Sequence, residues 1–151
     1  MARIRIQSLL ALTVAICAIG LATAGGAAAS PESQMMKKVN DYRHKHGLRS
    51  VKLASNLKHS AKRYADWMMS HHYFGHSSRI HASSRYRRLG EILERQRGGA
   101  NVSLAFRTWI NSGPHRAIIL DSRFRYAGAG RAYGMYEGYK NTFWVMHFGG
   151  S

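Results

Sequence analysis

The sequence is short of cysteine, proline and acidic residues, with one, two and seven of them among 151 residues. The single cysteine, Cys17, lies in an apolar N-terminal run, and Ile16 before it is not the small residue that lipid attachment requires. The rest of the chain therefore has neither a disulfide nor a thiol for catalysis. We expect a fold without disulfides that depends on its hydrophobic core alone.

The chain has 23 lysines and arginines but only seven acids, which gives a formal net charge of +16. A chain this basic attracts anionic polymers, lipid headgroups or nucleic acid, and salt weakens the attraction. The alternative is that the charge only keeps a solvated surface soluble. Nucleic acid is the least favoured partner because the sequence has no recognisable nucleic-acid-binding motif. We expect a monomer that meets an anionic envelope polymer or a membrane surface.

Residues 1–29 have the pattern of an export signal. Arg3 and Arg5 precede the apolar run 8–21, and the small residues at 22–24 and 27–29 offer cleavage sites. We expect cleavage and a secreted, extracellular product. An uncleaved membrane anchor is less favoured because the second half of the run is mostly alanine and glycine. Residues 30–151, with a net charge of +14 once the two leader arginines are removed from the +16 total, are enough for one domain.

The spacing of apolar residues predicts helices first and strands last. The helices are expected at 33–46, 55–71, 84–95 and 102–110, with a short helix after Pro114. An extended link is expected at 48–53, and an antiparallel pair of strands at 126–132 and 142–148. In the second strand Phe143, Val145 and His147 alternate with the residues of the other face. This order is typical of a layered α+β domain.

Four histidines lie within eleven residues, which raises the possibility of a metal site. They are His71, His72, His76 and His81. Their spacing matches no standard zinc motif, and Gly75 interrupts any regular geometry before His76. We expect His71, His72 and His81 to face solvent.

A further histidine is fixed by a corner between two helices. Pro114 suits the first turn of a helix, where its missing N–H is not needed. His115 follows directly and is therefore expected beside a helix N-terminus.

Short motifs in a fixed order run through the chain from about residue 35 to 149. They are Asn40-x-x-Arg43-x-x-x-Gly47, Phe74-x-His76-Ser77, Gly90-Glu91, Trp109-x-x-Ser112-x-x-His115-Arg116, Phe124-x-x-x-Gly128-x-Gly130 and the strand around Trp144. Together they resemble the bacterial branch of the CAP superfamily. This superfamily contains the cysteine-rich secretory, antigen 5 and pathogenesis-related proteins, and its module is also called the SCP domain.

The resemblance implies a three-layer α-β-α sandwich with a small antiparallel sheet and a wide cleft. It implies that His76, Glu91 and His115 line this cleft and can bind a divalent metal such as zinc. Two departures weaken the metal site: Ile92 replaces the asparagine of the family's Gly-Glu-Asn motif, and Ser112 stands where many members have a second acid.

Two functions of different classes follow. We expect a secreted binding module for an anionic cell-envelope or extracellular ligand, with no catalytic residue assigned. The alternative is an extracellular metal-dependent hydrolase of peptide or envelope material, since two imidazoles and a carboxylate are the ligand types of a catalytic zinc site. Without metal, Glu91 would instead hold one histidine in place. A serine nucleophile at Ser77, Ser78 or Ser112 is disfavoured because no Gly-x-Ser-x-Gly turn is present.

Overall fold

The computed structural model describes residues 28–151, and all but two residues of the expected leader lie outside this range. The described elements follow in the order α1 (Pro31–Lys45), β1 (Lys52–Leu53), α2 (Ser55–Ser70), β2 (Arg88–Arg97), α3 (Val102–Asn111), α4 (Gly113–Leu120), β3 (Phe124–Tyr136) and β4 (Tyr139–Gly150). Across residues 28–151 we find no helix with the length and apolar character that crossing a bilayer requires.

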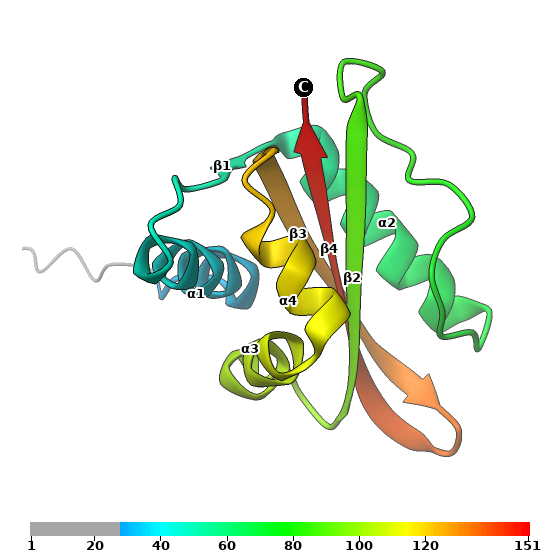
Figure 1. Ribbon diagram of the computed structural model, residues 1–151. Coiled ribbons are helices and arrows are strands. Elements are labelled where there is room, and N and C mark those ends of the chain that lie inside the picture. Colours follow the sequence, from blue (N-terminus) through cyan, green and yellow to red (C-terminus); the bar gives the residue numbers. More distant parts are fainter. Residues whose placement is uncertain (1–27) are drawn as a thin grey trace, which may run out of the picture.

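The strands form one sheet in the order β1-β3-β4-β2, which is antiparallel apart from the short parallel pairing of β1 with β3. Helix α2 packs on one face of the sheet, and α1, α3 and α4 pack on the other (Figure 1). The expected α-β-α sandwich is therefore confirmed.

Alternation along β4 divides the interior into two cores. Trp144 and Met146 face the core beneath α1, α3 and α4, whereas Phe143 and Val145 face the core beneath α2. All four side chains are fully buried. Because successive side chains of a strand point to opposite faces, one central strand joins both helical layers. The alternation expected for this strand is confirmed.

Two glycines of β3 allow α2 to lie directly on the sheet. A Cβ atom at Gly128 would collide with the backbone of Lys58, and one at Gly130 would collide with the backbone of Lys62. The helix completes this contact with alanine, since Ala61 is fully buried against the strand layer. These two glycines therefore allow the close approach of α2 to the sheet.

The β3–β4 hairpin is longer than the strands expected from the sequence. It closes with a two-residue turn in which Glu137 and Gly138 have φ values of 50° and 80°. Positive φ at both positions matches the twist of a tight hairpin and favours glycine at the second. This turn allows the strands to pair up to Tyr136 and Tyr139.

The helix expected at 84–95 is wrong, because this segment contains the edge strand β2. Leu89, Ile92 and Leu93 have helical spacing, but β2 lies between two helical layers and buries side chains on both faces. A strand covered on both faces loses the simple alternation of apolar and polar residues. Ile92 therefore enters one core and Leu93 the other.

A buried arginine joins α1 to the segment that links α4 and β3. Arg43 is fully buried, and its guanidinium donates hydrogen bonds to the carbonyl oxygens of Arg49, Ile119, Asp121 and Phe124. Burial lowers the pKa of this guanidinium, with a further contribution from the nearby charge of Arg125. The carbonyl oxygens compensate for the loss of water around the charge.

We expect Gly128→Ala to destabilise the protein by about 3 kcal/mol, because the added methyl group must displace the α2 backbone. Thermal or chemical unfolding would measure the loss. Gly99→Ala is the matched control, since no atom lies within 4 Å of its added Cβ. Equal stability of the two variants would contradict the close packing of α2 on β3.

Candidate functional site

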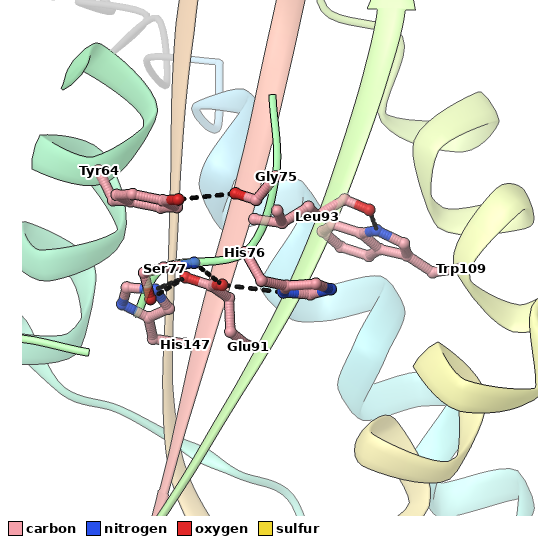
Figure 2. A network of polar contacts seen from close by, with 8 residues as sticks. All are labelled: Tyr64, Gly75, His76, Ser77, Glu91, Leu93, Trp109 and His147. Carbon is pink, nitrogen blue, oxygen red and sulfur yellow. Dashed lines mark hydrogen bonds and ion pairs between the residues drawn. The ribbon is translucent and has the colours of Figure 1, made fainter. Parts of the chain in front are cut away.

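Glu91 of β2 is the centre of the largest polar network that involves the expected site residues. It is 8% exposed and lies opposite His147 of β4 in the strand register. One carboxylate oxygen, Oε1, accepts hydrogen bonds from His76 Nδ1 and Ser77 N, both at 2.9 Å. The other oxygen, Oε2, accepts from Ser77 Oγ at 2.9 Å and from His147 Nε2 at 2.8 Å. The two imidazole rings approach the carboxylate from opposite sides (Figure 2).

These hydrogen bonds keep Glu91 ionised at neutral pH. Burial acts to raise the pKa of the carboxyl group, but the hydrogen bonds from His147, Ser77 and His76 outweigh burial and bring the pKa below its usual value. An ionised carboxylate only accepts hydrogen bonds, so His76 Nδ1 and His147 Nε2 must each carry a proton. The tautomers of both rings are therefore fixed by Glu91.

The loop before β2 is anchored so that it passes over this carboxylate. The Tyr64 hydroxyl of α2 donates to the Gly75 carbonyl at 2.6 Å, and the Phe74 ring packs 5.1 Å from that of Phe143. Burial, with the charge of Glu91, raises the pKa of Tyr64 to about 12, so its hydroxyl stays a donor. The two residues after Gly75 are thus held against the sheet.

His115 lies in the first turn of α4, as the corner at Pro114 indicated. It makes no hydrogen bond to Glu91. Its Nδ1 atom is buried and has no hydrogen-bond partner within residues 28–151. Burial lowers the pKa of His115, and the charge of His76 lowers it further, so the ring is neutral at neutral pH. Glu91 and His76 are in direct contact, and His115 is close enough to His76 for the charge of His76 to affect the pKa of His115.

The residues present fit a metal ion in part. Within the described chain, no group of three or more His, Cys, Asp or Glu side chains is arranged to hold a metal. Glu91 already accepts four hydrogen bonds, which occupy both of its oxygens. A carboxylate that binds one imidazole nitrogen commonly orients the other nitrogen toward a metal. Glu91 thus leaves His76 Nε2 as the nitrogen that could face an ion, and a metal site of His76, Glu91 and His115 stays a prediction.

The chain matches a known protein family in sequence and known structures in fold. A profile described as the cysteine-rich secretory protein family, CAP, matches residues 36–148. The chain belongs to the CAP family. An outer surface protein of Borrelia burgdorferi superposes with a TM-score of 0.67 at 17% identity, covering 80% of this chain and 92% of that one. An extracellular SCP-domain protein of Bacillus anthracis gives 0.64 at 21% identity, covering 80% and 40%.

One curated relative is an uncharacterized membrane protein of Bacillus subtilis, which is 27% identical over 106 residues. The match covers 66% of this chain and 31% of the relative, so the CAP chain spans about a third of that protein's length. The two solved structures are both below 25% identity and therefore establish the shared fold alone.

The most buried residue of the Glu91 network is His147, which the sequence did not assign to the site. The ring is 1% exposed, and its Nδ1 lies 3.1 Å from the Ser60 hydroxyl of α2. The sequence placed His147 on the same strand face as Phe143 and Val145 but gave it no role. A histidine among core residues of a strand needs a polar partner, and this requirement could have identified it.

The cleft of this CAP chain has a volume of about 640 Å³ and lies between α2 and the loop that follows it. Its basic lining residues are Arg63, His76, Arg79 and His81. Its aromatic lining residues are Tyr64, Trp67 and Tyr73, and Ser60, Ser77, Ser78 and His147 complete the wall. None of these lining residues is a carboxylic acid. His71, His72 and His81 are exposed, as expected.

We expect Glu91→Gln to lower stability by about 3 kcal/mol at pH 7, because it leaves buried donors without their charged acceptor. The pKa of Glu91 is lower in the folded than in the unfolded protein, so its contribution is present above the usual value of 4.5 and is lost as pH falls below it. The free energy of unfolding of both proteins should be measured between about pH 3 and pH 7. We expect the two values to converge in acid.

Glu137→Gln is the control for this variant, because Glu137 forms an exposed ion pair with Arg95. Its loss should cost less than about 1 kcal/mol at any pH. A gap between wild type and Glu91→Gln that stays constant into acid would refute the role of the Glu91 charge.

Proposed function

We propose that this CAP domain is an exported binding module whose cleft takes an anionic ligand of the cell envelope or extracellular space. The observation that carries the proposal is the composition of the cleft wall, which has four cationic or titratable basic side chains and no acid. Neither Arg63 nor Arg79 forms an ion pair with another residue of the described chain. Guanidinium groups without a partner are suited to carboxylate or phosphate.

The aromatic side chains of the cleft narrow the class of ligand. The Trp67 ring stacks on Tyr64 at 5.8 Å between centroids and meets Tyr73 edge-on at 5.7 Å. Trp67 is 45% exposed and Tyr73 is 44% exposed, so their rings are accessible. Flat apolar surfaces beside arginines suit a ring that carries a negative charge. An acidic sugar unit of an envelope polymer has this combination.

Export is part of the proposal. The leader pattern at 1–29, the absence of disulfides and the formal charge of +16 suit a monomeric protein that acts at an anionic surface. An outer surface protein and an extracellular protein share its fold. A membrane surface is a second anionic partner of this kind, and nucleic acid is less favoured because charge alone supports it.

We expect the protein to bind polygalacturonate, a carboxylated polysaccharide, and the double variant Arg63→Gln, Arg79→Gln to bind it at least about tenfold more weakly. Each arginine offers a charge-assisted hydrogen bond, and the loss of one costs about 1.5–3 kcal/mol. Calorimetry at low and at physiological salt would measure the affinity, which should fall as salt rises.

Arg107→Gln is the matched control, because Arg107 is exposed on α3, across the sheet from the cleft. It should bind as the wild type does. Equal binding of uncharged dextran, or full binding by the double variant, would exclude an anionic ligand in the cleft.

A metal-dependent hydrolase is the second candidate, and the paired histidines favour it. Glu91 holds His76 through Nδ1, and the neighbouring His115 is neutral with an unpartnered buried Nδ1 within the described chain. A bound zinc ion would supply an activated water for hydrolysis at this position. This chain's own residues would provide two imidazole ligands, and Glu91 would orient one of them.

For this candidate we expect zinc to bind with micromolar affinity, and His76→Ala and His115→Ala each to abolish binding. Titration calorimetry at neutral pH measures this directly. His71→Ala is the control, because His71 is exposed and stacks on Trp67 at 4.5 Å. No heat of binding, or binding that both variants retain, would exclude the two-histidine site.

A further inference from the structure

A serine and a histidine of the cleft wall form a continuous hydrogen-bonded chain with a glutamate that lies behind them. Ser60 Oγ lies 3.1 Å from His147 Nδ1, and His147 Nε2 lies 2.8 Å from Glu91 Oε2. Both oxygens of Glu91 accept hydrogen bonds from Ser77, so the Nε2 proton of His147 points to the carboxylate and Nδ1 carries the lone pair. Nδ1 is then the acceptor, and the Ser60 hydroxyl must be the donor.

This direction of hydrogen bonding is the one that activates a serine. A base next to the hydroxyl takes its proton, and a carboxylate holds the base in the required tautomer. In the chymotrypsin triad, Nε2 of the histidine faces the serine and Nδ1 faces the carboxylate. Here Nδ1 faces the serine and Nε2 faces the carboxylate. The nitrogen beside the serine is still the base, and the nitrogen beside the carboxylate still carries the proton. The arrangement is recognised by geometry and role and does not depend on residue order.

The fold brings the three residues together from three elements. Glu91 of β2 and His147 of β4 face each other in the strand register, and Gly128 of β3 is the neighbour of His147 on its other side. Because Gly128 has no side chain, the α2 backbone comes into contact with the strand there. Ser60 lies two residues after Lys58, at this contact, and so reaches the imidazole.

Ser60 and His147 also border the cleft. Ser60 is 4% exposed and His147 is 1% exposed, yet both form part of the cleft wall. Arg63 and Tyr64 follow Ser60 by three and four residues on α2, so all three lie on the helix face that lines the cleft. A group bound in the cleft would thus meet the Ser60 hydroxyl with a cationic side chain one turn away.

We propose that Ser60 is the nucleophile of an acyl-transfer site, with His147 as its general base and Glu91 as the positioning residue. The substrate is a carboxylic ester. Ser60 Oγ bonds to the ester carbonyl carbon while its proton moves to His147 Nδ1. The C–O bond of the ester then breaks, and the alcohol leaves with that proton. Water hydrolyses the resulting acyl-serine, giving the carboxylic acid and restoring Ser60.

The basic residues of the cleft wall affect which ester binds and how well the oxyanion intermediate is stabilised. Arg63 lines the cleft one helical turn from Ser60, so its guanidinium is a donor that can face an oxyanion there. Acylated hydroxyl groups on an anionic polymer are the first class of ester to consider. That choice rests on the proposed function, whereas the reactivity of Ser60 does not.

The test is covalent labelling of the purified full-length protein with a fluorophosphonate, read by intact mass and peptide mapping. Fluorophosphonates phosphonylate an activated serine and release fluoride. We expect one adduct on Ser60, no adduct in Ser60→Ala, and labelling at least a hundredfold slower in His147→Gln. Ser103→Ala is the matched control, because Ser103 is exposed on α3, across the sheet from the cleft, and it should label at the wild-type rate.

Mapping on the wild-type protein does not depend on whether a variant folds. An unlabelled wild-type protein, or an adduct mapped to another residue, would overturn the proposal. Hydrolysis of p-nitrophenyl acetate, a small neutral ester, provides the matching activity and should be lost in Ser60→Ala. Labelling of Ser60 in a wild-type protein that does not bind polygalacturonate would separate the nucleophile from the ligand. If Ser60 is not labelled while polygalacturonate still binds, the proposed binding function stands and the proposed acyl-transfer activity is refuted.

Discussion

The ionised carboxylate of Glu91 is the interaction on which the site of this CAP domain depends. A buried carboxylate is stable only when donors replace the water it has lost. Four hydrogen bonds meet this need, and they come from the loop after α2 and from β4. One charge on the edge strand therefore fixes the loop, the tautomers of two imidazoles and one side of the cleft.

Close packing of α2 on the sheet is the second constraint, and it acts on the same residues. Gly128 and Gly130 permit backbone contact between helix and strand. A larger residue at either position would push the helix outward and separate Ser60 from His147, which are only 3.1 Å apart. The polar chain in the cleft wall thus requires glycine on a strand that contributes no side chain to it.

The sequence predicted the fold and part of the site for identifiable reasons. Helices α1, α2 and α3 have one apolar stripe each, and β4 alternates between two cores, so local periodicity was sufficient. Strand β2 was missed because both of its faces are covered and its apolar residues follow one another. That error hid the register between Glu91 and His147, since only a strand places these two residues opposite each other. The contact of Glu91 with His76 came from a family resemblance, because no local pattern relates residues fifteen positions apart on a loop and a strand.

The two possible chemistries of this cleft share a single orienting group. Oε1 of Glu91 accepts from His76, and Oε2 accepts from His147, whose other ring nitrogen lies 3.1 Å from the Ser60 hydroxyl. A proton gained by the carboxylate would weaken both sets of hydrogen bonds at once, whereas changes at His76 or at Ser60 act on one side only. The histidine pair and the serine are therefore separable by mutation but coupled through the charge of Glu91. A cation bound at His76 would draw on the same carboxylate that holds the tautomer of His147, so each occupant of the cleft must influence the other.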